Sequence, residues 1–241
     1  MISFAVPAYN EEKFIKNTID TIIEAVNITE ITHYEIIIIN DGSNDNTGNI
    51  INRLSLNNKD IKTIHHKQNK GLGCSIKEAI CVAQYEKFIF VPGDNDLPKT
   101  SIIDLIINRN KADIVMLYIL NKEIRGRRRT VISLVYGIIY MLTFNVFVQY
   151  LQGPCVYPLK KLREIDIFSN RFTIMAEVNL KILKTGVTFY EIPGYTQTGA
   201  KGSTALSLKN FLEIVMGYVR LFWEIKISKK RIYNKYPVRV Y

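Results

Sequence analysis

Cysteine is scarce in this chain, which has three cysteines among its 241 residues. Cys74, Cys81 and Cys155 form neither an even set nor a C-x-x-C pair, and this pattern excludes a disulfide framework. Free thiols of this kind indicate a reducing compartment. We also expect no signal peptide, because an apolar strand that begins at Ile2 leads directly to the acid Glu11. We therefore expect a cytoplasmic protein.

The glycine-rich phosphate-binding loops of the common nucleotide-binding folds are missing as well. The turn after the first apolar strand reads Pro7-Ala8-Tyr9-Asn10-Glu11, where a dinucleotide-binding fold needs G-x-G-x-x-G. The chain contains no P-loop sequence. A dinucleotide or ATP site of the usual kind is therefore excluded.

Acidic residues are outnumbered, with 22 against 32 basic residues and a formal net charge of +10. The chain beyond Glu224 contains basic residues and no acid, and a second basic cluster comprises Arg125, Arg127, Arg128 and Arg129. This excess favours an anionic partner: a phosphorylated ligand, an acidic membrane surface or a nucleic acid. We expect no nucleic-acid partner, because neither an aromatic-basic stacking motif nor a helix-turn-helix signal occurs.

Apolar strands alternate with helical patterns through the first half of the chain. The expected strands cover residues 2–6, 34–40, 61–66, 86–91 and 112–120. Helical apolar spacing falls between them, at 11–26, 47–56, 74–84 and 102–107. Uninterrupted apolar strands in such a β-α repeat predict an α/β fold with a mostly parallel sheet covered by helices on both faces.

Ligands of such sheets bind at the carboxyl ends of the strands. Four polar segments follow predicted strands, and all four should lie along this edge: Pro7–Glu11, Asn40–Thr47, Asn69–Gly73 and Asp94–Asp96. Asp94 and Asp96 follow the strand that ends near Val91 and are spaced i, i+2. Carboxylate oxygens are the ligands that Mg²⁺ or Mn²⁺ prefers, so the pair is a candidate metal site. The alternative is an Asp-rich turn without a metal.

These four segments resemble, in order and spacing, the motifs of the family 2 glycosyltransferases. The similarity is greatest to the dolichol-phosphate mannose synthase group and its bacterial polyprenyl-phosphate sugar transferase relatives. Related segments continue through the second half of the chain: Arg125 and the arginines after it, Gly153-Pro154, Ala176-Glu177, Gly186, Glu191–Pro193 and Gly199–Thr204. The resemblance implies a GT-A nucleotide-sugar-binding fold.

The resemblance also implies roles for individual residues. Asp94 and Asp96 match the metal-binding acids that clamp the donor diphosphate. The donor-binding set is Pro7, Ala8, Tyr9, Glu11, Asp41, Lys70, Gly71 and Asp94. For Pro7, Gly42 and Gly71, turn geometry is an equally good explanation, and Asp45 and Thr47 are better explained as helix-capping residues.

Two departures from the family pattern stand out. Asn40 occupies a position where the family usually has an acid, which puts one ribose or base contact in doubt. Pro98 occupies a position where near relatives often have a glutamine ligand, and proline offers no donor atom. Both departures motivate the alternative of a non-catalytic sugar-nucleotide-binding homologue.

The acceptor decides whether the reaction needs a base. A hydroxyl acceptor needs a carboxylate to take its proton, whereas a phosphate monoester, with a second pKa of about 6, is already an anion. The predicted acceptor-phosphate residues are Arg125, Arg127, Arg128, Arg129 and Lys201, with a solvated basic loop as the alternative. Glu177 aligns with a family glutamate near the acceptor and is expected to orient the site or act as a base, unless it lies on a surface helix. The predicted catalytic residues are Asp94, Asp96, Arg125 and Glu177.

Two segments point to a membrane surface. The 21 uncharged residues Val131–Leu151 suit helices at the membrane interface, a core helix or a transmembrane span, in that order of preference. Residues 206–225 carry one apolar stripe followed by the basic tail. We predict a catalytic domain over residues 1–204, with a nucleotide-binding half (1–120) and an acceptor half (121–204), and a membrane-associating segment over 205–241. A separate membrane-anchoring subunit is a further candidate partner.

Overall fold

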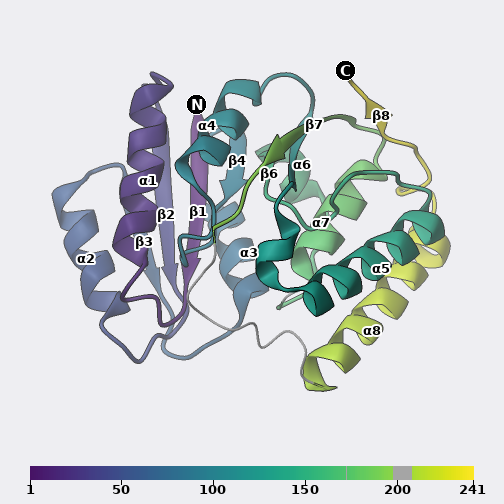
Figure 1. Cartoon of the computed structure of the whole chain (residues 1–241), viewed down its shortest axis with the longest axis horizontal. Coiled ribbons are helices and arrows are strands. Elements are labelled where there is room, and N and C mark those ends of the chain that lie inside the picture. The colour runs from purple at the N-terminus through teal and green to yellow at the C-terminus, as the bar shows by residue number, and fades with distance from the viewer. Residues whose placement is uncertain (172, 198–207) are drawn as a thin grey trace.

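The computed structural model describes residues 1–171, 173–197 and 208–241, and describes the backbone alone for residues 125, 128, 129 and 208–211. These residues form one eight-stranded sheet with helices packed against it (Figure 1). The strands are β1 (Ile2–Ala8), β2 (Tyr34–Asn40), β3 (Ile61–His65), β4 (Lys87–Phe90), β5 (Ile114–Ile119), β6 (Cys155–Pro158), β7 (Thr188–Gly194) and β8 (Val238–Arg239). The helices are α1 (Ile15–Ile28), α2 (Thr47–Asn57), α3 (Leu72–Val82), α4 (Lys99–Asn108), α5 (Arg127–Phe144), α6 (Leu159–Glu164), α7 (Ile174–Leu183) and α8 (Leu208–Trp223), with a 3-10 turn η1 (Lys122–Arg125) and a π-turn η3 (Glu224–Ser228).

The strand order is β3-β2-β1-β4-β6-β5-β7-β8. All neighbouring pairs are parallel except those that involve β6, which runs antiparallel to both β4 and β5. Parallel pairing places the carboxyl ends of β1, β2 and β4 at the same edge. The predicted mostly parallel α/β sheet is therefore confirmed.

Strand β2 shows why its sequence is an uninterrupted apolar run. Ile36 and Ile38 pack into one core, together with side chains from α1, α2 and α4. Ile37 and Ile39 pack into the other core, together with side chains from α3, α6 and α7. All four isoleucines are fully buried, and each contributes on the order of 1.5–3 kcal/mol of burial free energy.

The C-terminal segment packs on the same sheet. Leu221, Ile225 and Tyr233 are buried in the core that also contains α3 and α7, and β8 pairs with β7. Two basic residues of the tail form ion pairs: Lys229 contacts Asp166 and Glu224, and Arg239 contacts Glu191. The division at residue 204 stays a prediction, but the segment after residue 207 is an integral part of the fold.

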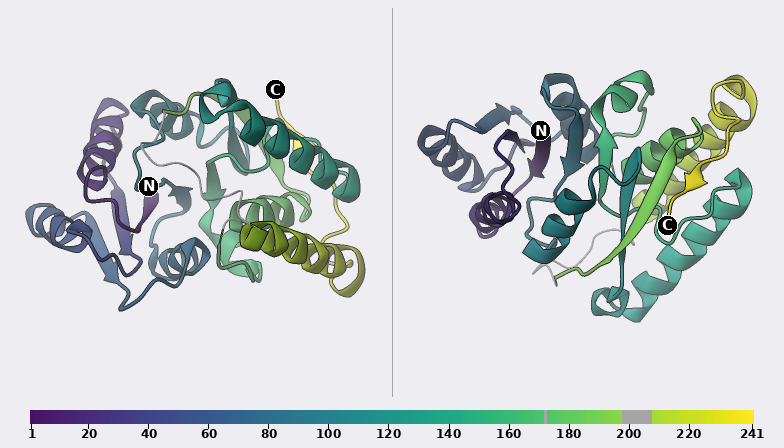
Figure 2. Two further views of the ribbon diagram at one scale, coloured as in Figure 1. Left: turned by 60° about the horizontal axis from the view of Figure 1, so that its bottom comes forward. Right: turned by 90° about the horizontal axis from the view of Figure 1, so that it is seen from above.

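Helix α5 covers only the first part of the uncharged stretch 131–151. It ends at Phe144, where Asn145 adopts the left-handed conformation with φ 53°. Within the described residues, none of the helices combines the length and the apolarity that a membrane crossing requires. Figure 2 shows β3, β2 and α2 at one end of the molecule and α5 and α8 at the opposite end.

Candidate active site at the carboxyl edge of the sheet

The predicted convergence of polar segments at one edge of the sheet is confirmed. The Asp41 amide donates to the Ala8 carbonyl at 2.9 Å, and the Gly93 amide donates to the Pro7 carbonyl at 3.2 Å. These bonds join the ends of β1, β2 and β4 in one continuous rim. The turn with Asp94 and Asp96 therefore begins beside the first motif, because Gly93, the residue before Asp94, is hydrogen-bonded to Pro7.

The first motif is fixed by the segment after β2. The Asn10 amide donates to Ser43 Oγ at 3.0 Å and the Glu11 amide donates to Thr47 Oγ1 at 2.8 Å. Asn10 itself adopts a left-handed conformation with φ 56°, which turns the chain away from β1. Tyr9, just before this bend, remains 42% exposed at the rim.

Asp45 and Thr47 have structural roles just before and at the start of α2, although the N-cap residue itself is Asn46 and makes no side-chain cap hydrogen bond. Asp45 Oδ1 accepts hydrogen bonds from the amide and the hydroxyl of Thr47, and Oδ2 accepts one from the Glu12 amide. Burial alone would raise the pKa of Asp45, but these hydrogen bonds outweigh it and lower the pKa below its usual value. The carboxylate stays charged and holds the two motifs together.

Asp94 and Asp96 occupy one tight turn after β4. Asn95, between them, has a left-handed φ of 57°, and the Asp96 amide donates to Asp94 Oδ1 at 3.1 Å. Both acids are partly buried. The Asp96 carbonyl accepts hydrogen bonds from the Gln197 amide at 2.7 Å and from Thr196 Oγ1 at 3.2 Å, so the segment after β7 is fixed against this turn.

This turn fits a hard divalent cation. It supplies two carboxylates within three residues at the carboxyl edge of a parallel sheet, and Mg²⁺ is usually held by one or two carboxylates together with substrate phosphates. Pro98 precedes α4 and contributes no ligand atom, so phosphates and water would complete the coordination.

A small cavity lies beside Asp96. Its volume is about 90 Å³, and its wall is formed by Phe90, Pro92, Asp96, Leu97, Ile119, Tyr150, Gln152, Pro154, Met175 and Thr196. The cavity therefore lies between the Asp94–Asp96 turn and residues of the second half of the chain.

The sequence analysis did not single out Lys122, which lies near this cavity. Its Nζ lies 4.6 Å from the centre of the ring of Tyr150, a residue of the cavity wall, and burial lowers its pKa.

Asp41 is buried and fixes the loop that leads into α3. Its Oδ1 accepts from the Lys70 amide at 2.8 Å and its Oδ2 accepts from the Gly71 amide at 2.9 Å. Its exposed fraction is 4%, so the carboxylate fixes the loop at Lys70 and Gly71 from the protein interior. Contact of Asp41 with the donor itself stays a prediction.

Gly71 has a geometric role in the same loop. Its φ of 93° is a conformation that side chains disfavour, and a Cβ atom there would meet the Asn170 carbonyl. The turn-geometry explanation therefore holds for Gly71, and also for Gly42, whose φ is 71°. Neither geometry excludes a backbone contact with a donor phosphate.

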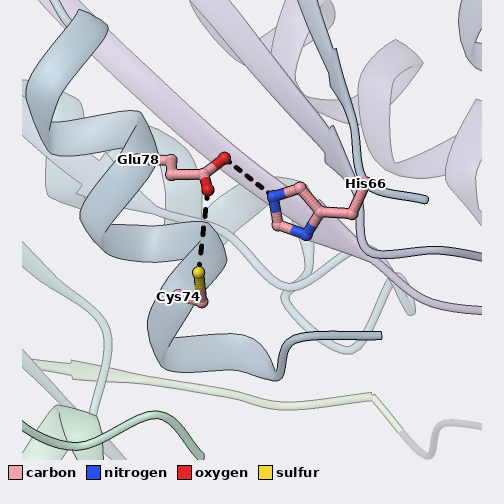
Figure 3. Close-up of side chains that lie close together, drawn as sticks. All are labelled: His66, Cys74 and Glu78. Atoms are coloured by element: carbon pink, nitrogen blue, oxygen red, sulfur yellow. Dashed lines mark hydrogen bonds and ion pairs between the residues drawn. The ribbon is translucent and has the colours of Figure 1, made fainter. Parts of the chain in front are cut away.

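Two histidines that sequence analysis left without a role lie at this edge. Asn40 Nδ2 lies 3.2 Å from His65 Nδ1, and Asn40 Oδ1 accepts from the Ser43 amide at 3.0 Å. An amide serves both contacts, which accounts structurally for asparagine at this position. His66 contacts Asp41 through Nδ1 and Glu78 through Nε2, each at 2.7 Å, and Figure 3 shows Glu78 between His66 and Cys74. The sequence feature that could have indicated these contacts is the pair of adjacent histidines at the end of a predicted strand.

Glu177 is a buried residue, which excludes the alternative that it lies on the surface of a helix. Its exposed fraction is 1%. Oε1 accepts from the Phe168 amide at 2.9 Å and from Lys181 Nζ at 2.7 Å, and Oε2 accepts from the Ser169 amide at 2.8 Å. Since both oxygens are engaged by protein donors, the geometry favours a positioning role and argues against a general base.

The predicted acceptor residues are only partly described. Arg127 begins α5 and is exposed, whereas the side chains of Arg125, Arg128 and Arg129 and the whole of Lys201 lie outside the described residues. The backbone places Arg125 at the end of η1, the 3-10 turn that begins at Lys122. Phosphate binding by this cluster stays a prediction.

Sequence comparison places these motifs among known transferases. The family model described as Glycosyl transferase family 2 matches residues 3–166. A dolichyl-phosphate beta-glucosyltransferase from Dictyostelium discoideum is 25% identical over 93% of this chain and 77% of its own. A poly-beta-1,6-N-acetyl-D-glucosamine synthase from Staphylococcus epidermidis is 36% identical over 39% of this chain. The chain spans 21% of that synthase and 45% of a Trichomonas vaginalis dolichyl-phosphate beta-glucosyltransferase that it also resembles.

Solved structures show the same fold. Glucosyl-3-phosphoglycerate synthase from Mycobacterium tuberculosis, in complex with Mn²⁺, uridine diphosphate and phosphoglyceric acid, superposes with a TM-score of 0.65 at 14% identity, over 92% of this chain and 78% of that one. S. aureus TarS 1-349 in complex with UDP-GlcNAc gives a TM-score of 0.61 at 17% identity, over 95% of this chain and 68% of that one. The fold is of the GT-A type. Together with the family match, which covers more than half of the residues, it shows that this chain belongs to the family 2 glycosyltransferases.

Proposed function

We propose that this chain transfers a sugar, with inversion, from a nucleoside diphosphate sugar to a polyprenyl phosphate at the cytoplasmic face of a membrane. The observation that carries the proposal is the position of the Asp94–Asp96 turn, which is joined to the ends of β1 and β2 through the Gly93–Pro7 and Asp41–Ala8 hydrogen bonds. This rim offers carboxylates for a cation beside two motifs that suit a nucleoside. Solved structures of the same fold that contain UDP, UDP-GlcNAc or Mn²⁺ support this donor class and this cofactor.

Displacement of the diphosphate builds negative charge on the leaving group. A Mg²⁺ or Mn²⁺ ion held by Asp94 and Asp96 would neutralise that charge. Pro7–Glu11 and Asp41 form the wall for the base and ribose, and the loop at Lys70 and Gly71 approaches the donor through its backbone. Hydrogen bonds from the segment after β7 to the Asp96 carbonyl keep the turn in place.

The hydrogen bonds that Glu177 accepts from the protein support a phosphate acceptor. A phosphate monoester, with a second pKa of about 6, is an anion near neutral pH and needs no base. Glu177 accepts from the Phe168 and Ser169 amides and from Lys181, which suits a reaction that does not call on it as a base. Arg125, Arg127, Arg128, Arg129 and Lys201 would instead hold the acceptor phosphate, since arginine forks match phosphate oxygens.

An apolar face formed by α5 and α8 supports the membrane location. The two helices are in contact, since Thr143 Oγ1 lies 2.8 Å from the Tyr218 hydroxyl and the rings of Tyr140 and Tyr218 pack edge to face at 5.2 Å. This α5/α8 face comprises the exposed side chains Val131, Ile132, Leu134, Val135, Ile138, Ile139, Leu142, Leu212, Val215, Met216, Val219, Phe222 and Trp223. Large exposed apolar surfaces mark membrane or protein contacts, and flanking basic residues attract anionic lipid.

Replacing Leu142 and Met216 together by glutamate should weaken binding to vesicles that contain anionic lipid by about a hundredfold or more. Both side chains are well exposed, at 64% and 65%, so the fold should tolerate the change. Each buried side chain contributes about 1.5–3 kcal/mol to membrane insertion, and every 1.4 kcal/mol is about a tenfold change in affinity. Vesicle co-sedimentation measures the effect. Leu56→Glu, which changes a leucine 86% exposed on α2 at the other end of the molecule, is the matched control and should bind as the unmodified protein does.

Nucleoside diphosphates should stabilise the protein only when Mn²⁺ is present. At a free concentration of about 100 Kd, the matching diphosphate should raise Tm by about 5–10 °C in thermal unfolding. A panel of UDP, GDP and their sugars identifies the base, and inorganic pyrophosphate separates the contribution of the phosphates. If no nucleotide raises Tm under any metal condition, the donor assignment fails.

A hydroxyl acceptor on a glycan is the second candidate, because the staphylococcal relative is named as a polysaccharide synthase. That reaction requires a base, and Glu177 would have to serve. Glu177→Gln would then abolish turnover, whereas a phosphate-acceptor enzyme should keep measurable turnover in the folded fraction. Transfer assays with a polyprenyl phosphate and with an oligosaccharide acceptor separate the two.

A further inference from the structure

A compact cluster of metal-binding side chains lies next to the loop at Lys70 and Gly71. It consists of His66, Cys74 and Glu78 (Figure 3). The Nε2 atom of His66 lies 2.7 Å from Glu78 Oε2, and Cys74 Sγ lies 3.7 Å from Glu78 Oε1. One ligand atom from each of the three residues lies within 4.8 Å of the others. The transferase mechanism proposed above uses none of these three side chains.

The local structure explains why these side chains meet. Cys74 and Glu78 are four residues apart on α3, so they project from the same helix face. His66 follows β3 immediately, and its amide donates to the Asn40 carbonyl at 2.9 Å. The histidine is therefore held at the rim, facing the first turns of α3.

Asp41 gives His66 the orientation that metal-binding histidines commonly have. Its Oδ1 lies 2.7 Å from His66 Nδ1, so this carboxylate can accept a hydrogen bond from Nδ1–H and direct Nε2 toward Glu78 and Cys74. Metal-ligating histidines nearly always donate their other ring N–H to a carboxylate, a backbone carbonyl or water. Asp41 is itself fixed by the Lys70 and Gly71 amides, and the His66 side chain is only 1% exposed.

We propose that His66, Cys74 and Glu78 bind Zn²⁺, or a divalent metal of similar softness, at a site separate from the Asp94–Asp96 pair. Thiolate and imidazole ligands select such metals, whereas an all-carboxylate turn selects Mg²⁺ or Mn²⁺. Metal–ligand distances of about 2.0–2.3 Å in a tetrahedral site place donor atoms roughly 3.3–3.7 Å apart, so small side-chain rotations suffice. Three protein ligands leave the fourth position to water.

Metal binding changes two further contacts. The Cys74 thiol, whose pKa is raised by burial and by the neighbouring Glu78, releases its proton to solvent and binds as the thiolate. Lys70 Nζ, which lies 3.2 Å from Glu78 Oε1, moves away, and its 45% exposed side chain has room to do so. The metal then ties the residues after β3 to α3, on either side of the donor loop at Lys70 and Gly71.

Equilibrium dialysis with Zn²⁺ and absorption spectroscopy with Co²⁺ as the probe test this site on the chain of 241 residues. The unmodified chain should bind one Zn²⁺ per molecule, and Co²⁺ should give a thiolate-to-metal charge-transfer band in the near ultraviolet. Cys74→Ala should weaken Zn²⁺ binding by about 100-fold or more. Loss of a residue that only hydrogen-bonds to a metal ligand already lowers metal affinity by roughly 10- to 100-fold. This variant keeps the His66 contacts with Asp41 and Glu78, so its fold should be preserved.

Cys81→Ala is the matched control, because Cys81 lies on the same helix α3 and is exposed. It should bind Zn²⁺ as the unmodified chain does. The proposal is overturned if the unmodified chain binds no Zn²⁺, if its Co²⁺ complex lacks the thiolate band, or if Cys74→Ala binds Zn²⁺ equally well. Loss of Zn²⁺ binding in Asp96→Asn would also overturn it, because the metal would then occupy the other site. These measurements need no turnover, so they are independent of the transferase assignment.

Discussion

Replacing Asp96 by asparagine should lower the rate of sugar transfer by about a thousandfold and leave the fold intact. Removal of one group that stabilises developing charge typically costs about 10²- to 10³-fold in kcat, and loss of a metal carboxylate adds weaker metal binding. The amide has the size of the carboxylate but lacks its charge. Asp96 lies partly exposed on a turn, and the hydrogen bonds from Thr196 and Gln197 go to its backbone carbonyl, which the substitution keeps.

Steady-state transfer rates across a Mn²⁺ titration measure this effect. The variant should need more Mn²⁺ and should remain slow at saturation. Asp104→Asn, an identical change on the exposed side of the neighbouring helix α4, is the control and should keep the unmodified rate. Turnover of Asp96→Asn within about tenfold of the unmodified chain would show that this acid does not hold the catalytic cation.

The strands of the first half could be predicted because their signal is local. The four isoleucines of β2 are buried in two cores on opposite faces of the sheet, and such a strand has no reason to alternate with polar residues. A parallel sheet then determines where the polar segments after each strand must gather. The convergence of the first motif, Asp41 and the Asp94–Asp96 turn therefore followed from the sequence before any contact was known.

Strand β6 could not be predicted from local sequence patterns. It has four residues, Cys155–Pro158, and it lies between β4 and β5 in antiparallel direction. A run this short carries little periodicity, and its place in the sheet depends on partners more than 35 positions away in the sequence. The cavity beside Asp96 depends on this insertion, since Pro154, next to β6, forms part of its wall.

The ionic partners of the residues at the site also could not be predicted from the sequence. His66 is 25 residues from Asp41 and 12 from Glu78, and sequence spacing alone says nothing about such pairs. Glu177 could be aligned with a family glutamate, but only the structure shows Lys181 beside it and the Phe168 and Ser169 amides on its oxygens. Its burial and these contacts favour a positioning role over that of a base.

Lys181→Met should lower the free energy of unfolding by about 3 kcal/mol, because it removes the cation from a buried ionic network. The Lys181 side chain is fully buried, with Nζ 2.7 Å from Glu177 and 2.7 Å from Glu224, and it donates to the Asp166 carbonyl. Methionine has a similar length but leaves the two carboxylates without their shared partner. The expected loss lies at the lower end of the range for broken buried pairs, because Lys229 still contacts Glu224 at 2.9 Å.

Urea unfolding followed by circular dichroism measures the loss, and Lys16→Met provides the matched control. Lys16 forms an i, i+4 pair with Asp20 but is 65% exposed, so the same substitution there should cost less than about 0.5 kcal/mol. Adding Glu177→Gln to Lys181→Met should recover part of the stability, because the pair then carries one buried charge fewer. A Lys181→Met protein as stable as the control would show that Glu177 is held by the Phe168 and Ser169 amides alone. In that case the loop at 166–170, whose Asn170 carbonyl accepts from the Gly73 amide at the start of α3, would not depend on the buried lysine.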